Sequence, residues 1–148
     1  MIVRALLAFL ALPGLVAFLV PFLIAWPRVR EGSFNALALI LLIPGIALLL
    51  WCVRDFLVIG KGTLAPWDPP RSLVSSGPYR FSRNPIYLGF VCLLAGFPLI
   101  FRMYWGLILC PLLILSMNAL VIQHEEAYLE KKFGDVYTSY KSRVRRWL

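Results

Sequence analysis

Four long stretches of the chain contain no Asp, Glu, Lys or Arg, and they constrain the fold more than any other feature. They are 18 to 23 residues long and comprise Ala5–Pro27, Gly32–Val53, Asn84–Phe101 and Met103–Gln123. A helix needs about 20 apolar residues to cross the hydrocarbon core of a bilayer, which is about 30 Å thick. Because lipid offers no partner for free backbone amides, each stretch is predicted to be a membrane-spanning helix. The first apolar run is too long for a typical signal peptide, so we expect it to be retained.

The composition supports an integral membrane protein. The chain of 148 residues is 61% hydrophobic and only 15% charged, with a formal net charge of +8. These values exclude a disordered tail, a disulfide-rich secreted module and most soluble enzymes. Basic charge on so apolar a chain points to a membrane surface rather than to nucleic acid. We expect an all-α membrane protein with four transmembrane helices, the last two forming a hairpin, and a C-terminal amphipathic interfacial helix.

The predicted spans also give a domain organisation and an orientation. All of residues 1–148 are expected to form a single membrane domain, with a two-helix N-terminal part (1–53) and a catalytic part (54–148). Four spans place both termini and the middle loop on the same side, and that side carries twelve of the fifteen Lys and Arg residues. Since cytoplasmic loops carry the excess of basic residues, both termini are predicted to be cytoplasmic.

The cysteines and the single histidine do not indicate a metal site. The chain has three cysteines, an odd number, and they form no CxxC motif. All of them lie in apolar stretches, and they are Cys52, Cys92 and Cys110. This pattern favours a role in packing over a disulfide or a zinc site. His124 is the only histidine. A metal site normally needs three or four ligands, so positioning by hydrogen bonds is the preferred role for His124.

Polar residues gather first in the middle loop, Arg54–Arg83, which lies between the second and third apolar stretches. Asn84 suits an N-cap and Pro85 suits the first position of a helix. A helix N-terminus with Arg83 beside it is a ready anion site, and Tyr87 lies on roughly the same helix face as Asn84. The alternative is that Asn84 and Pro85 only start the helix while Arg83 extends to lipid headgroups.

Acidic residues gather where the fourth apolar stretch ends. Four of the seven acids of the chain lie between Glu125 and Asp135. An anionic inner leaflet repels acids, and the C-terminal end of a helix disfavours Glu125 and Glu126. A positively charged ligand would offset both effects. The alternative is that these glutamates are solvated and pair with Lys131 or Lys132.

The C-terminal segment carries a helical pattern of its own. Phe133-Gly134 is typical of a helix end. The apolar residues beyond it fall within one 120° sector of a helix, and they are Phe133, Val136, Tyr137, Tyr140, Val144 and Trp147. This pattern predicts an amphipathic interfacial helix, which serves either as an anchor or as a lid over a site.

Two motifs resemble a known family. The first is Gly77-Pro78-Tyr79-Arg80-x-x-Arg83-Asn84-Pro85-x-Tyr87-x-Gly89, and the second is Glu125-Glu126-x-x-Leu129-x-x-x-Phe133-Gly134-x-x-Tyr137-x-x-Tyr140-Lys141-x-Arg143-Val144. Together they resemble the signatures of small bacterial integral-membrane methyltransferases of the isoprenylcysteine carboxyl methyltransferase and phospholipid methyltransferase family. The chain has Asn84 where the isoprenylcysteine branch has His, and Arg145 where the family often has Pro.

The resemblance implies an S-adenosyl-L-methionine pocket at the cytoplasmic face of a bacterial inner membrane. The acceptor would be a lipid-like or lipid-modified molecule that enters from the membrane. The implied cofactor-binding residues are Gly77, Tyr79, Arg83, Asn84, Tyr87, His124 and Glu125. The implied catalytic residues are Glu125, Glu126 and Arg80. In this interpretation Arg83 and the amides near Asn84 bind the cofactor's carboxylate, and Glu125 or Glu126 holds its cationic end.

The remaining implied roles concern the adenosine and the acceptor. Tyr79 and Tyr87 would pack on the adenosine or the sulfur, and Arg80 would orient an anionic acceptor group. An amine acceptor must lose a proton, which Glu125, Glu126 or His124 could take. The sequence does not rank Glu125 over Glu126, and it leaves the acceptor atom and the oligomeric state open.

Two other function classes compete with the enzyme hypothesis. One is a non-catalytic membrane protein that kept the fold and binds a lipid or scaffolds a partner. The other is a small transporter, which would ordinarily place ionisable residues near the bilayer midplane. The four apolar stretches contain no Asp, Glu, Lys or Arg, which argues against ion-coupled transport.

Overall fold

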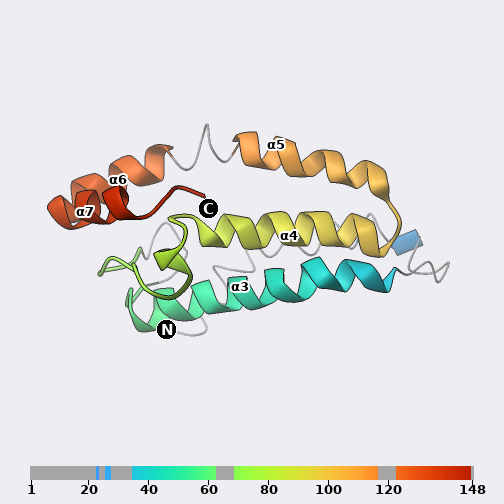
Figure 1. The fold of residues 1–148 in the computed structure, drawn as a ribbon, viewed down its shortest axis with the longest axis horizontal. Helices are drawn as coiled ribbons and strands as arrows, with labels where there is room; N and C mark the ends of the chain where they lie inside the picture. The colour runs from blue at the N-terminus through green and yellow to red at the C-terminus, as the bar shows by residue number, and fades with distance from the viewer. Residues whose placement is uncertain (1–22, 24–25, 28–34, 63–68, 117–122, 148) are drawn as a thin grey trace.

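The computed structural model describes residues 23, 26–27, 35–62, 69–116 and 123–147, and every regular element among them is helical (Figure 1). The α-helices are α3 (Leu39–Val58), α4 (Pro85–Ile100), α5 (Leu109–Ser116), α6 (Gln123–Phe133) and α7 (Asp135–Arg143). Short 3₁₀ helices are η2 (Ala36–Ala38), η3 (Gly77–Arg80) and η4 (Tyr104–Ile108). The predicted all-α class is confirmed for these residues. The predicted first span, Ala5–Pro27, lies almost wholly outside them.

The helix formed by η2 and α3 is the clearest membrane-spanning segment. Residues Ala36–Val58 form 23 continuous helical residues that are long and apolar enough to cross a bilayer. Helix α4 is apolar but has only 16 residues. Among the described residues, one of the predicted spans therefore meets the length of about 20 residues, and the four-span arrangement stays a prediction.

One boundary in the sequence-based prediction is wrong. The second span was expected to end at Val53, but α3 continues to Val58 and includes Arg54 and Asp55. The buried residues of α3 are Leu42, Gly45, Leu49, Cys52 and Asp55, which follow one another at steps of three or four. This spacing keeps one helix face toward the protein, so Asp55 continues the buried face instead of entering a loop.

Helices α3 and α4 pack closely because glycines line their contact. An added Cβ atom at Gly45 would lie 2.8 Å from Cβ of Cys92, and one at Gly89 would lie 2.8 Å from Cγ of Leu49. The core around this contact includes Leu42, Leu49, Phe90 and Leu93. Small residues allow helix backbones to approach each other in membranes, where van der Waals packing drives helix association.

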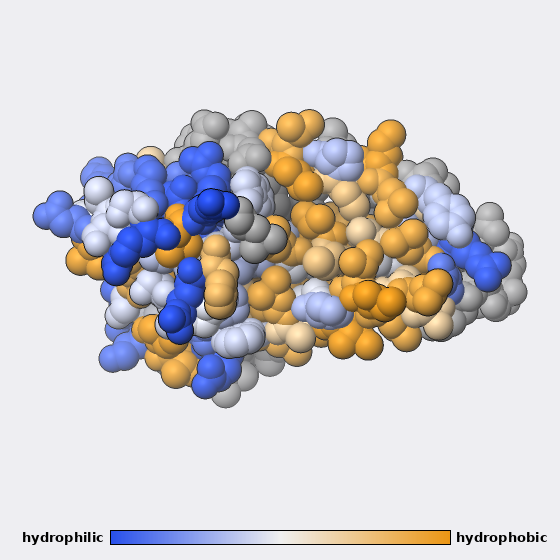
Figure 2. Space-filling view, viewed as in Figure 1, coloured by the Kyte–Doolittle hydropathy of each residue, from blue (hydrophilic) through white to orange (hydrophobic). Residues whose placement is uncertain are grey.

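The predicted hairpin forms between α4 and α5. Figure 1 shows α5 running back along α4, with α3 on the other side of α4. The chain reverses at Arg102, which has a positive φ of 55°, and Met103 N donates to the carbonyl of Pro98 at 2.7 Å. On the face shown in Figure 2, hydrophobic residues cover the middle of the helical bundle, a large hydrophilic group lies at the end where α6 and α7 are, and a smaller one lies at the opposite end.

The C-terminal amphipathic pattern is confirmed only in part. Gly134, with φ of 53°, separates α6 from α7. Tyr137 and Tyr140 are buried as the pattern predicts, but Val136 is 64% exposed and Val144 lies beyond the helix in extended conformation. The buried face of α7 packs on the middle loop, since the hydroxyl of Tyr140 donates to the carbonyl of Tyr79 at 2.8 Å. Its contact with a membrane stays a prediction.

The close approach of α3 and α4 gives a test of the packing. We expect Gly45→Ala to destabilise the protein by about 1–3 kcal/mol, because neither Cβ can rotate away and the helices must separate. Thermal unfolding in detergent measures the effect. Leu50→Ala is the control, since Leu50 is on α3 but 62% exposed. A Gly45→Ala protein that melts at the wild-type temperature would contradict the described contact.

Candidate functional site

The middle loop reaches α4 through a tight turn that requires glycine at its start. Gly77 begins η3 with φ of 56°, a conformation that glycine adopts readily. An added Cβ there would lie 2.4 Å from Oδ2 of Asp55 and 2.9 Å from Nε1 of Trp51. Asp55 is 1% exposed and its Oδ1 pairs with Nη1 of Arg54 at 3.2 Å. Asp55 and Trp51 at the end of α3 therefore lie directly against the Gly77 turn.

Helix α4 begins as the sequence predicts, but Asn84 does not cap it through its side chain. Pro85 occupies the first helical position and Asn84 the N-cap position. Nδ2 of Asn84 instead donates to the carbonyl of Arg146, 3.0 Å away, and its backbone N–H donates to Oγ of Ser82 at 3.1 Å. The polar groups at the start of α4 are thus engaged by the loop and by the C-terminal segment.

The C-terminal segment docks on the start of α4 through its backbone. We call residues 144–147 the tail. Oγ of Ser82 donates to the carbonyl of Arg146 at 3.1 Å, and the backbone N–H of Arg83 donates to the carbonyl of Arg145 at 2.9 Å. With the Asn84 contact, three hydrogen bonds hold the tail beside α4. Residues more than sixty positions apart are thereby brought together.

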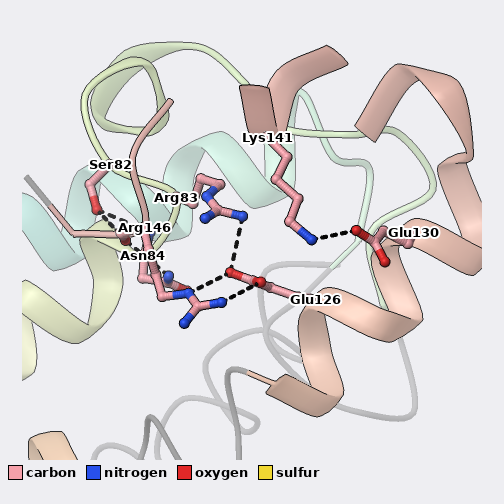
Figure 3. Close-up of polar contacts among 7 residues, drawn as sticks. All are labelled: Ser82, Arg83, Asn84, Glu126, Glu130, Lys141 and Arg146. Atoms are coloured by element: carbon pink, nitrogen blue, oxygen red, sulfur yellow. Dashed lines mark hydrogen bonds and ion pairs between the residues drawn. The ribbon is translucent and has the colours of Figure 1, made fainter. Parts of the chain in front are cut away.

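Glu126 joins the start of α4, helix α6 and the tail (Figure 3). Arg146 donates to both carboxylate oxygens, from Nε to Oε1 at 2.9 Å and from Nη2 to Oε2 at 2.8 Å. Nη1 of Arg83 lies 3.1 Å from Oε1 of the same carboxylate. The side chains of Arg83 and Glu126 are 11% and 10% exposed. This ion triad (Arg83, Glu126 and Arg146) therefore carries one surplus positive charge in a partly buried place.

Arg83 has an unused donor in the triad. Its Nε is buried and has no hydrogen-bond acceptor among the described residues, whereas its buried Nη1 contacts Glu126 as an ion pair. Buried donors are normally satisfied, because an unsatisfied one costs about 1–3 kcal/mol. The Nε–H of Arg83 therefore lacks an acceptor in the part of the chain that the structure describes.

Glu125 has different surroundings from those of Glu126. Adjacent residues of a helix point about 100° apart, so the two carboxylates face different groups. Oε2 of Glu125 accepts a hydrogen bond from the hydroxyl of Tyr87 at 2.9 Å, and the side chain is otherwise exposed. Desolvation raises the pKa of Glu125 by more than the hydrogen bond from Tyr87 lowers it, and the charge of Glu126 adds a smaller increase.

The pKa of Glu126 shifts in the opposite direction. Desolvation alone would raise it, but the hydrogen bonds from Arg146 and the charge of Arg83 bring the pKa of Glu126 below its ordinary value. A second, outer pair lies nearby, in which Lys141 of α7 contacts Glu130 of α6 (Figure 3). The two adjacent glutamates are thus electrostatically distinct: Glu126 is held ionised, and Glu125 more readily accepts a proton.

The structure brings five of the candidate residues together and places others apart. Arg83, Asn84, Tyr87, Glu125 and Glu126 lie where α4 begins and α6 passes. Tyr79 is 6% exposed and packs with Cys52, Val74 and Phe56 in a small core. Burial raises the pKa of its hydroxyl well above the ordinary value.

Three further candidates do not contribute a described side-chain contact to this group. Gly77 lies over Asp55 at the end of α3, and Arg80 is exposed. His124 is in the first turn of α6, directly before Glu125, and its side chain lies outside the described residues. Their roles stay predictions.

Sequence reasoning missed Arg146, Ser82 and Asp55. Arg146 received no role because nothing in the local sequence separates an ion-paired Arg from its exposed neighbours. Asp55 carried a signal, since it continues the three-or-four spacing of buried residues on α3. Ser82 and Arg146 meet only through a contact across 64 residues.

The described residues thus form a bundle of helices with an apolar core and a polar site at one end. This arrangement places the protein in the class of helical proteins that combine an apolar bundle with a polar site. The sequence profile of the phospholipid methyltransferase family matches residues 33–136, which is most of the chain. The chain belongs to this family. The resemblance stated from its motifs is thereby confirmed at the level of the family.

Individual relatives match shorter segments. An uncharacterized protein of Haemophilus influenzae is 60% identical over 35 residues, which are 24% of this chain and 56% of that protein. Protein-S-isoprenylcysteine O-methyltransferase of Schizosaccharomyces pombe is 33% identical over 72 residues, which are 49% of this chain and 30% of that enzyme. The matches thus span little more than half of one relative and about a third of the other. No solved structure matches the chain significantly.

The lowered pKa of Glu126 gives a pH test of the ion triad. A carboxyl whose pKa is depressed by folding contributes stability above its unfolded pKa, about 4.5, and loses it as the pH falls through the folded pKa. We expect Glu126→Gln to lower stability at pH 7 by about 1–3 kcal/mol. The difference from wild type should shrink as the pH falls below about 4.5 and vanish once the pH is below the folded pKa of Glu126, as measured in a thermal unfolding series.

Glu130→Gln is the matched control, because Glu130 lies on the same helix in a half-exposed pair with Lys141. Its effect at pH 7 should stay below about 1 kcal/mol. Equal effects of the two substitutions, or a Glu126→Gln effect that does not shrink as the pH is lowered from 7 through 4.5 and below, would contradict the described triad.

Proposed function

We propose that this protein transfers a methyl group from S-adenosyl-L-methionine to a lipid-like or prenylated acceptor at the cytoplasmic face of a membrane. Membership of the phospholipid methyltransferase family supports a methyltransferase, and the similarity to an isoprenylcysteine O-methyltransferase supports a lipid-modified acceptor. The observation that carries the proposal is the pairing of an anion-accepting group with a cation-accepting group. These are the guanidinium of Arg83, whose Nε has no acceptor among the described residues, and the carboxyl of Glu125.

The residues of this chain fit a zwitterionic cofactor. The amino-acid end of S-adenosyl-L-methionine presents a carboxylate, an ammonium and a sulfonium. The ion triad has one surplus positive charge and an unused buried donor on Arg83, which suit a carboxylate. Glu125 is accessible and has only the Tyr87 hydroxyl as its described hydrogen-bond partner, which suits a cation.

Glu125 is the better candidate for contact with the cofactor's cationic end, and Glu126 for positioning. Both oxygens of Glu126 are already bound by guanidinium groups. An approaching cation would meet Arg83 and Arg146 beside it. Glu125 faces Tyr87, and in the described part of the chain the Tyr87 hydroxyl is its side-chain partner, with no ion pair to a cation.

When bound, S-adenosyl-L-methionine supplies an electrophilic methyl group that leaves sulfur as the acceptor's electron pair forms the new bond. The chain's own residues hold the two ends of the cofactor and exclude water, because alignment and desolvation dominate a charge-neutralising displacement. Glu125 can take the proton that an amine acceptor must lose, since a raised pKa suits a base near neutral pH. Arg80, exposed on the same loop, can orient an anionic acceptor group.

We propose the membrane arrangement that the sequence predicts. The apolar surface of α3 and the hydrophilic end of the molecule agree with a single membrane domain whose polar site lies at the headgroup level. With both termini cytoplasmic, the site opens on the cytoplasmic side and the acceptor enters from the lipid. Residues 1–53 then form the N-terminal part and residues 54–148 the catalytic part.

Cofactor binding is the most direct test. We expect the protein purified in detergent to bind S-adenosyl-L-methionine saturably in titration calorimetry. Arg83→Ala and Glu125→Gln should each weaken binding about tenfold or more, because each removes a charge-assisted contact. Glu130→Gln should bind as wild type does. Wild-type affinity in the Arg83→Ala, Glu125→Gln double variant would contradict the site assignment.

A wild-type protein that binds no cofactor would favour the alternative, a non-catalytic protein that binds lipid or scaffolds a partner. The acceptor class is then tested with radiolabelled cofactor and two probes. Transfer to N-acetyl-S-farnesylcysteine indicates a prenylated acceptor, and transfer to phosphatidylethanolamine vesicles indicates a phospholipid. Binding without transfer to either probe or to a total membrane extract would contradict the proposed activity.

The raised pKa of Glu125 predicts how binding depends on pH. A cation binds the ionised carboxylate, so affinity for S-adenosyl-L-methionine should fall as the pH is lowered through the titration of Glu125. The affinity of Glu125→Gln should lack this pH dependence. Titration calorimetry at several pH values measures both, and an identical pH dependence in the two proteins would contradict the role of Glu125.

A further inference from the structure

We propose that Ser82 and Asn84 are positioning residues that act on the site through the tail. They hold the backbone of the tail, the tail holds Glu126, and Glu126 sets the position of helix α6, which carries Glu125. The inference rests on the proposed function. It gives Asn84 a different role from the one that the motif implies, in which Asn84 contacts the cofactor.

The tail uses the side chains of both positioning residues. Ser82 is 1% exposed and Asn84 is 7% exposed. Oγ of Ser82 and Nδ2 of Asn84 donate to the same carbonyl, that of Arg146, at 3.1 and 3.0 Å. A carbonyl oxygen has two lone pairs, so these two donors satisfy it completely. The amide nitrogen of Asn84 is therefore directed at the protein's own backbone.

The tail connects these contacts to α6. The backbone N–H of Arg83 donates to the carbonyl of Arg145 at 2.9 Å, so two successive carbonyls of the tail are held at the start of α4. From this fixed backbone the side chain of Arg146 reaches Glu126 with contacts of 2.9 and 2.8 Å. Figure 3 shows the guanidinium of Arg146 meeting the carboxylate of Glu126. The tail thus links the start of α4 to α6.

Helix α6 depends on polar contacts for its position. Among the residues of α6 whose side chains the structure describes, Glu126 is the buried one, and most of the others are exposed. A segment with few buried apolar contacts shifts at low cost. Glu125 is the preceding residue, and its carboxylate accepts a hydrogen bond from the hydroxyl of Tyr87 at 2.9 Å. The contacts that fix Glu126 therefore also keep Glu125 opposite Tyr87.

The docking of the tail has a direct readout that needs no ligand. Trypsin cuts after arginine, and the carbonyls that it must attack in the tail, those of Arg145 and Arg146, are the hydrogen-bonded ones. We expect the Ser82→Ala, Asn84→Ala double variant to lose its last residues about tenfold faster than wild type, because cleavage requires the tail to open. Intact-mass spectrometry of the full chain in detergent, sampled early in the digest, measures the rate.

Asn35→Ala is the matched control. Oδ1 of Asn35 accepts a hydrogen bond from the N–H of Leu37 at 3.2 Å, and the backbone N–H of Asn35 donates to the carbonyl of Ile100 at the far end of α4. The substitution therefore removes a helix-capping contact far from the tail. It should leave both the cleavage of the tail and the affinity for S-adenosyl-L-methionine at their wild-type values.

A double-mutant cycle separates action through the tail from direct contact with the cofactor. We expect Asn84→Ala to weaken binding of S-adenosyl-L-methionine about threefold to tenfold, because α6 loses part of its support. In an Arg146→Ala background, where the tail no longer reaches Glu126, Asn84→Ala should cause no further loss. A direct contact between Asn84 and the cofactor would instead give the same loss in both backgrounds. Titration calorimetry on the full chain in detergent measures all four affinities.

A second cycle, with Glu125→Gln in place of Arg146→Ala, shows where the effect ends. If the tail works by placing Glu125, Asn84→Ala should change the affinity by less than about twofold once that carboxylate is gone. A general weakening of the fold would instead lower the affinity alike with and without the Glu125 carboxylate.

The outcomes are distinct. Unchanged cleavage of the tail in the double variant, wild-type affinity in Asn84→Ala, or equal losses across either cycle would overturn the inference and leave the proposed function standing. A wild-type protein that binds no S-adenosyl-L-methionine would overturn the proposed function itself, and the positioning role with it. Faster cleavage, together with a loss of affinity that disappears in both backgrounds, would establish the role of Ser82 and Asn84.

Discussion

The carboxylate of Glu126 is the group on which the arrangement of the polar end depends. It is 10% exposed, and a carboxylate with so little contact to water needs compensating charge and hydrogen bonds. Arg83 at the start of α4 and Arg146 in the tail supply them. Because these residues come from three separate segments, satisfying one buried charge also fixes the entrance of α4 against α6 and brings the tail back across it.

The two adjacent glutamates, Glu125 and Glu126, have different partners at this end of the molecule. Neighbouring helical positions point about 100° apart, so Glu126 faces the two arginines while Glu125 faces Tyr87. Their pKa values consequently shift in opposite directions, below the ordinary value for Glu126 and above it for Glu125. A site for a zwitterion needs this kind of asymmetry, with donors at one end and an accessible carboxylate at the other.

Local patterns predicted the elements, and long-range contacts decided the site. The absence of charge predicted the apolar helices α3 and α4. Asn84-Pro85 predicted the start of α4, and Gly134 predicted the end of α6. The start and the end of a helix can be predicted in this way because they depend on residues within one helical turn. Asp55 was placed in a loop because a charge normally ends an apolar run. The roles of Arg146, Ser82 and the Asn84 side chain could not be predicted, since they arise from contacts across about sixty residues that have no local signature.

The central claim is that Arg83 and Glu125 bind the two oppositely charged ends of one ligand, with Glu126 held aside by Arg146. An experimental structure of the protein in a lipid nanodisc with S-adenosylhomocysteine tests it most directly. The account predicts the ligand's carboxylate at Nε of Arg83, its ammonium at Glu125, and the Arg146–Glu126 contacts retained. A ligand bound elsewhere, or one whose ammonium contacts Glu126 after Arg146 has left it, would contradict the account.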